Sequence, residues 1–158
     1  SSRDQIGSDF YFVVYHHEKS VSGDSHLRSD CHLSTTLLYA ENKMHIVINI
    51  IIGVTALLHI GFLTVEMFLW DKPTGRNIFH TTVEFAAQSK TLAANQGLYN
   101  GFLTAGLIWG LFADDSVKIF FLSCVIIAGI YGAFTVSKRI FYIQALPALI
   151  GLALLLVA

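Results

Sequence analysis

The chain has 158 residues, of which 54% are hydrophobic and 13% charged, and its formal net charge at pH 7 is −1. So few charges exclude the charge-rich surface of an ordinary soluble domain, and we expect no nucleic-acid partner. The charges are also uneven, because ten fall in residues 1–43 and eleven in the remaining 115.

Residues 1–43 form a polar extension that ends at Met44, the first methionine, and a long apolar run follows directly. Two interpretations stay open. The extension belongs to the natural protein, or it is upstream sequence joined to a protein whose natural start is Met44, which we favour. No apolar segment with a small-residue cleavage site precedes Met44, so the extension is not a signal peptide.

The extension holds several potential metal ligands, namely His16, His17, His26, Cys31 and His32. Zinc sites usually pair their ligands at short, regular spacing inside a fold, whereas here one cysteine stands among scattered histidines. We therefore expect no metal site there. Cys31 is not expected to form a disulfide with Cys124, which lies inside an apolar span.

Four apolar segments are predicted to be transmembrane helices: His45–Trp70, Asn95–Ala113, Val117–Val136 and Ile140–Ala158. The first has 26 residues, more than the ~20 that a helix needs to cross the hydrocarbon, and the others are near that minimum. A soluble bundle would show a polar stripe on every helix, but the last two segments are apolar all round. Residues 44–158 are thus predicted to form an all-α, integral membrane four-helix bundle.

The connections between the segments predict the topology. Asp114–Ser116 and Ser137–Arg139 are short, so the helices that they join should be antiparallel neighbours. The long loop Asp71–Ala94 opens with the turn-forming DKPTG, and its second half can form a short interfacial helix that leads into the second span. The first and third loops carry five lysines and arginines against about two on the other side, which predicts that these loops face the cytoplasm and both termini face outward.

Polar residues within the spans gather toward the cytoplasmic end: Glu66, Asn95, Gln96, Asn100, Tyr131 and Gln144. A rise of ~1.5 Å per residue places four of them, one from each helix, about 6–10 Å inside the boundary: Glu66, Asn100, Tyr131 and Gln144. Lys138 and Arg139 are candidate charge partners of the Glu66 carboxylate. Such a layer is typical either of a polar pocket or of hydrogen bonds that hold helices together, and both interpretations stay open.

His59 lies seven residues before Glu66 on nearly the same helical face, ~10 Å deeper. It is either a neutral buried histidine bonded to a neighbouring group or the floor of a pocket whose mouth is Glu66. In the fourth span, Pro147 leaves the carbonyl of Ile143 without its usual partner and is expected to kink the helix beside Gln144.

Small residues four apart predict close approach of helices, namely Gly97 with Gly101, Gly106 with Gly110, and Ala128 with Gly132. This pattern concerns packing and needs no function to explain it.

Several segments of this chain resemble a bacterial family of small membrane proteins known as domain of unknown function 1304. The resemblance is carried by EMFLW (66–70), PTGR (73–76), LAANQGLYNGFLTAGLIWG (92–110), VKIFFLSCVIIAGIYGAFTV (117–136) and QALPA (144–148). It covers essentially all of residues 44–158 and none of residues 1–43. It implies a four-helix protein of the bacterial inner membrane without an established activity, and it supplies no catalytic residues.

The leading hypothesis is a protein that binds a small amphiphile, such as a quinone or a lipid, in a cytoplasm-facing pocket. The candidate ligand-binding residues are the six polar residues above together with His59, although Asn95 and Gln96 lie at the mouth and are as well suited to cap a helix. A proton-coupled transporter subunit and a non-catalytic assembly protein remain alternatives, and a homo-oligomer is left open. We expect no cofactor, since no heme-ligand pair, CxxC motif or nucleotide-phosphate loop occurs.

Overall fold

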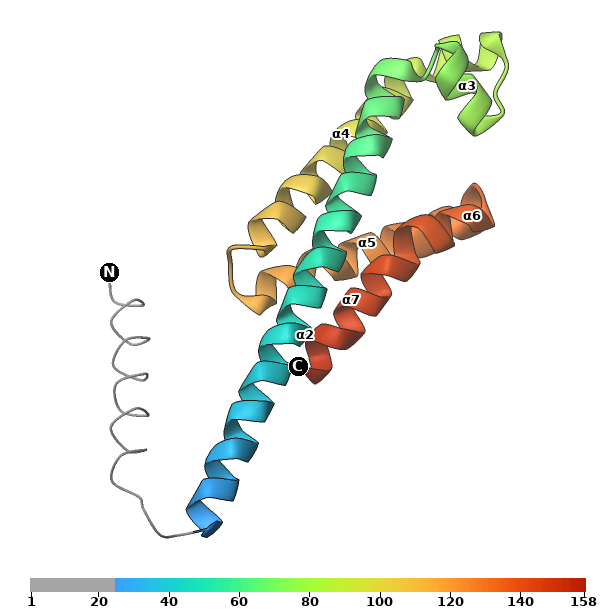
Figure 1. The fold of residues 1–158 in the computed structure, drawn as a ribbon. Helices are drawn as coiled ribbons and strands as arrows, with labels where there is room; N and C mark the ends of the chain where they lie inside the picture. The colour runs from blue at the N-terminus through green and yellow to red at the C-terminus, as the bar shows by residue number, and fades with distance from the viewer. Residues whose placement is uncertain (1–24) are drawn as a thin grey trace. The chain divides into compact units, whose positions relative to one another are not determined.

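A computed structural model describes the backbone of residues 25–158 and the side chains of residues 35–158. The elements are α2 (Ser25–Thr64), η1 (Val65–Leu69), α3 (Pro73–Phe79), α4 (Val83–Gly110), α5 (Asp115–Thr135), α6 (Lys138–Ile140), η2 (Phe141–Ala145) and α7 (Leu146–Val157), as Figure 1 shows. The two η elements are single π-helical turns. No strand occurs in this part of the chain, and the predicted all-α class is confirmed.

The chain divides into two compact units, residues 1–42 and residues 43–158, and the account below concerns the second. A natural start at Met44 stays a prediction. The prediction about the scattered potential metal ligands lies outside the described residues. His16 and His17 are not described at all, and the side chains of His26, Cys31 and His32 are not described.

Three helical stretches of the described chain are long and apolar enough to cross a membrane: Thr35–Leu69, Asp115–Thr135 and Lys138–Val157. They correspond to the first, third and fourth predicted spans and make this a membrane protein. The helix α4 has 28 residues, which is also long enough, but amides and charges along its first half lower its hydropathy. Its role as a fourth span stays a prediction.

The segment between the first two spans is more helical than its turn-rich sequence suggests. Pro73 occupies the first turn of α3, where its missing N–H costs nothing, and His80 ends α3 in the left-handed conformation with φ 53°. Thr82 then caps α4, because its hydroxyl accepts a hydrogen bond from the Phe85 N–H at 3.2 Å. The predicted interfacial helix is therefore the first part of α4 itself.

As predicted from the short connections, α4 and α5, and α5 and α7, pack as antiparallel neighbours, and glycines set the close contacts. A Cβ on Gly106 would lie 2.0 Å from the ring of Phe121, and one on Gly110 would lie 3.3 Å from the Lys118 side chain. The apolar core gathers at the end of the bundle where α4 meets α5, and its buried members are Ile48, Ile52, Ala56, Leu107, Leu122, Val125, Ile126, Ala148 and Leu155.

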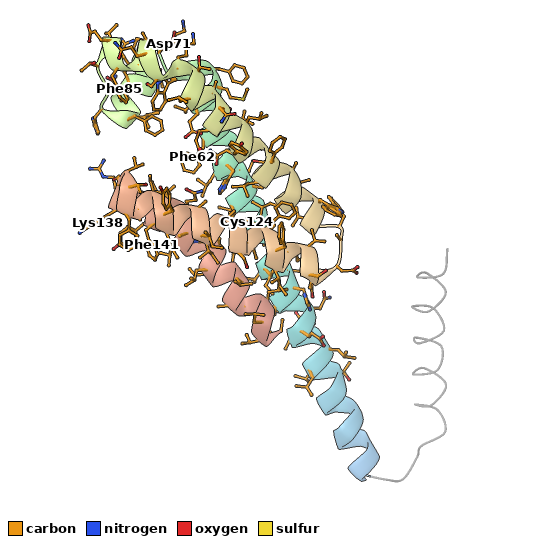
Figure 2. The ribbon with its side chains drawn as sticks, turned by 180° about the vertical axis from the view of Figure 1, so that it is seen from behind. Phe62, Asp71, Phe85, Cys124, Lys138 and Phe141 are labelled. Carbon is orange, nitrogen blue, oxygen red and sulfur yellow. The ribbon has the colours of Figure 1, made fainter. Side chains whose placement is uncertain are left out.

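Toward the opposite end of residues 43–158 the elements sort into two arms (Figure 1). In the first arm, η1 packs against α3 and α4, whereas in the second arm α5 packs against α6 and η2. Figure 2 shows Asp71 and Phe85 on the first arm and Lys138 and Phe141 on the second. The predicted polar layer lies at this end.

Candidate functional site

Glu66 and Asn100 form a hydrogen-bonded pair within the first arm. The Asn100 amide donates from Nδ2 to Glu66 Oε2 at 2.7 Å, and the same nitrogen lies 3.4 Å from the carbonyl oxygen of Gln96. Helical side chains lean toward their own N-terminus, so on two antiparallel helices these two lean toward each other. Asn100 is only 5% exposed and Glu66 is half-buried, which makes the pair part of the interior rather than of the surface.

Glycines on α4 bring the pair together. A Cβ on Gly97 would lie 2.6 Å from Met67 Cγ and 3.2 Å from Glu66 Cβ, and a Cβ on Gly101 would lie 2.8 Å from Leu63 Cδ1. The backbone of α4 therefore approaches η1 more closely than any larger residue would allow. The predicted role of Gly97 and Gly101 in close packing is confirmed.

His59 and Gln144 form a second pair, which joins α2 to η2. His59 is fully buried, and its Nδ1 lies 2.8 Å from the carbonyl oxygen of Thr55, which can only accept. The Nδ1 therefore carries the proton of the neutral ring, and Nε2 accepts a hydrogen bond from Gln144 Nε2 at 3.2 Å. This pair connects the two arms at their base.

Each of the two pairs draws one member from a π-helical turn, Glu66 from η1 and Gln144 from η2. In η2 the Leu146 N–H bonds to the carbonyl of Phe141, five residues earlier, and Pro147 follows immediately. A π turn thus lies just before Pro147, where the sequence predicted a kink, and the kink itself stays a prediction. Single π turns are rare, and they occur frequently at functional sites.

Two threonines that the sequence reasoning did not single out complete this interior. Thr104 is 8% exposed, donates to the Asn100 carbonyl at 3.0 Å and lies 3.5 Å from the Ala56 carbonyl of the facing helix. Thr55 is fully buried and supplies the carbonyl that His59 contacts. Each threonine stands four residues from a candidate, and that helical spacing is the signal that could have found them.

The other candidates do not join these pairs. Asn95 and Gln96 are exposed on α4, and Tyr131 on α5 is 71% exposed. On α5, Gly129 contacts Ala145 of η2. Tyr131 is two residues further along, so it lies about 200° around the helix from that contact. Of the residues that were placed at one depth, Tyr131 therefore does not face the interior with Asn100 and Gln144.

Lys138 and Arg139 are exposed on α6, and neither contacts Glu66 in an ion pair. Within residues 35–158 the ion pairs are Lys90 with Asp71, at 2.9 Å, and Lys118 with Asp115, at 2.8 Å. The Glu66 carboxylate is thus held by an amide in this structure.

Outside the spans, the Lys90–Asp71 pair and a tryptophan fix the end of the first arm. The hydrogen bond from Lys90 holds the pKa of the Asp71 carboxyl below its usual range. Trp70 donates from Nε1 to the Ser89 hydroxyl at 3.0 Å, and its ring packs 4.8 Å from that of Phe79. This contact sets Trp70 level with Ser89 on α4.

Two shallow apolar grooves lie away from the polar pairs. One, of about 240 Å³, is lined by Ile50, Ile51, Val54, Leu146, Pro147 and Ile150, and the other, of about 270 Å³, by Trp109, Ser116, Val117, Phe120 and Phe121. Among the described residues no three histidines, cysteines, aspartates or glutamates gather closely enough to hold a metal ion.

Comparison with known proteins identifies the family but not an activity. The family model described as "Protein of unknown function (DUF1304)" matches residues 53–156. The chain is also 32% identical over 92 residues, 55% of this chain and 77% of the relative, to the uncharacterized protein YpaA of Lactococcus lactis subsp. lactis strain IL1403. No solved structure matches significantly. Because the family model covers about two thirds of its length, this chain belongs to the DUF1304 family.

Proposed function

We propose that this membrane protein binds a small amphiphile whose polar head donates a hydrogen bond or carries a positive charge to Glu66. The observation that carries the proposal is which oxygen of the Glu66 carboxylate accepts a hydrogen bond. Its Oε2 accepts from Asn100, while Oε1 accepts no hydrogen bond from any group in residues 35–158. A half-buried acceptor near a membrane boundary favours a donor from outside the chain.

This chemistry narrows the class of ligand. A carboxylate accepts hydrogen bonds, so an ammonium or hydroxyl head fits it, and the hydroxyls of a quinol fit it better than the carbonyls of a quinone. An anionic head would be repelled unless a cation compensated it. The apolar tail would lie along the surrounding helices, which already present aliphatic and aromatic side chains.

His59 and Gln144 lie deeper than Glu66 and form a hydrogen bond with each other, so we assign them to the floor of the site. The lysine and arginine bias of the loops favours the cytoplasmic side for this site, and we propose that the protein lies in the bacterial inner membrane with both termini outside. No group here suggests a reaction, and we assign no catalytic step. A polar path for transport through one chain is not favoured, because the core beyond His59 is largely apolar.

An assembly role is the alternative that the same geometry favours, since both pairs join separate helices and interhelical hydrogen bonds stabilise bundles. In that case Glu66 would contribute to stability without any ligand.

Native mass spectrometry of the protein extracted gently from its membrane separates the two roles. We expect a specific bound amphiphile on the unaltered protein and on the control variant Glu84→Gln, whose carboxylate lies outside the spans. The variant Glu66→Leu should lose it. A bound species that survives Glu66→Leu would overturn the proposal, and so would a protein that carries no such species while Glu66→Leu lowers only its thermal stability.

A further inference from the structure

The first arm provides no positive charge for the Glu66 carboxylate. The π turn that carries Glu66 packs against α3 and α4, and the basic side chains of those helices are engaged elsewhere. Lys90 of α4 pairs with the Asp71 carboxylate at 2.9 Å, and Arg76 of α3 donates from Nη1 to the Asp71 carbonyl oxygen. Lys72 is exposed in the turn that precedes α3, and it forms no ion pair with Glu66.

The second arm provides no positive charge for Glu66 either. Its basic side chains, Lys138 and Arg139, are exposed on α6, and neither forms an ion pair with Glu66. His59 is neutral, because a backbone carbonyl holds its Nδ1 proton and Gln144 donates to its Nε2. A half-buried carboxylate beside hydrocarbon is costly unless an opposite charge pairs with it. Among the described residues no such charge is in place.

We propose that the ligand of this site is a cationic amphiphile whose head is an ammonium with at least one N–H. This inference rests on the proposed function and narrows it to one class of ligand. The positive charge supplies what the described chain lacks, and the N–H supplies a donor for Glu66 Oε1, the oxygen that accepts no hydrogen bond. Because charge-assisted hydrogen bonds are stronger than neutral ones, an ammonium is preferred to a hydroxyl.

The surroundings of the carboxylate suit an ammonium better than a metal ion. Hard metal cations take about six or more oxygen ligands, whereas an ammonium needs one acceptor for each N–H. Asn100 turns its donor nitrogen toward Glu66, and no three acidic, histidine or cysteine side chains gather among the described residues. Glu66 stands four residues before the interfacial Trp70, ~6 Å along the helix, so the head would lie just inside the membrane boundary.

Three probes with the same dodecyl chain separate charge from hydrogen bonding. Dodecylammonium offers both a charge and N–H groups, dodecyltrimethylammonium offers the charge alone, and dodecanol offers a neutral hydroxyl. Equilibrium binding of each radiolabelled probe to the full chain in lipid nanodiscs, with protein-free nanodiscs subtracted, gives the three dissociation constants. We expect dodecylammonium to bind about tenfold or more tightly than either of the other probes.

The variant Glu66→Gln tests the charge at the site itself. Glutamine keeps the size of the side chain and an acceptor for Asn100, but it carries no charge. The affinity for dodecylammonium should fall about tenfold or more in this variant, and it should be unchanged in the control Glu84→Gln, whose carboxylate is exposed outside the spans.

Two results would overturn the cationic class. The first is equal affinity of dodecylammonium for the unaltered protein and for Glu66→Gln. The second is a neutral or quaternary probe that binds as tightly as dodecylammonium and is lost in Glu66→Leu. The second result would leave the amphiphile proposal standing, so the two proposals fail separately.

Discussion

The hydrogen bond between Asn100 and Glu66 gives the most quantitative prediction. Asn100→Leu keeps most of the side-chain volume but removes the donor that lies 2.7 Å from Glu66 Oε2, and Glu66→Leu removes the acceptor. Each single variant leaves a polar partner unsatisfied in the interior. The double variant leaves neither, because two apolar side chains then face each other.

The magnitude follows from this comparison. Hydrogen bonds between membrane helices average about 0.6 kcal/mol, and bonds to a charged group reach about 1.5–3 kcal/mol. For a half-buried carboxylate we expect each single variant to lower the free energy of unfolding by about 1–2 kcal/mol, and the double variant to cost about as much as one single variant. The coupling energy in the double-mutant cycle should therefore be about 1–2 kcal/mol.

Reversible unfolding in mixed detergent micelles, followed by tryptophan fluorescence, measures the four proteins of the cycle. Gln88→Leu, an exposed amide of the same helix, serves as a control that should show no coupling to Glu66→Leu. If the effects of Asn100→Leu and Glu66→Leu add to within about 0.3 kcal/mol, the two side chains do not interact and the geometry of the site is refuted.

Two further predictions concern packing and charge. Gly106→Ala should lower the free energy of unfolding by about 1–3 kcal/mol, because its Cβ would lie 2.0 Å from the Phe121 ring. The control Gly53→Ala, with open space around its Cβ, should be neutral or stabilising. Equal effects of the two variants on thermal unfolding would contradict this packing. Lys90→Met should raise the pKa of the Asp71 carboxyl toward its ordinary value, since the Lys90 hydrogen bond is what lowers it. The stabilisation from this pair is present above the pKa that the Asp71 carboxyl has in the unfolded chain, and it is lost as the pH falls through the lower pKa of the folded chain. If the titration of Asp71, followed by NMR, is the same in Lys90→Met as in the unaltered protein, the role of Lys90 is excluded.

The sequence predicted the helices because their signals are local. These signals are apolar runs of spanning length, short connections and glycines four apart. The glycine pattern predicted close helix contacts, and the structure has them at Gly97, Gly101, Gly106 and Gly110. The second span was predicted to begin at Asn95 after a separate interfacial helix, whereas the structure has one continuous helix from Val83, because hydropathy marks where a helix becomes apolar and not where it begins.

The pairing within the site was beyond the sequence. Counting residues gives the level of a residue along its helix and its angle relative to other residues of that helix, but it does not say which neighbouring helix a given face meets. Glu66 therefore meets Asn100 rather than a residue of the other arm, Gln144 meets His59 through a π turn that no local pattern announces, and Tyr131 points away despite its matching depth.

The central claim is that Glu66 Oε1 receives a donor from a bound amphiphile. An experimental structure in nanodiscs cut directly from the native membrane, at a resolution that shows lipid heads, tests it most directly. The account predicts elongated density whose polar end lies within hydrogen-bond distance of Oε1 and whose tail follows the helices of the first arm. It would be contradicted by an Oε1 bonded to a donor of the same chain, or by a carboxylate with no such density beside it.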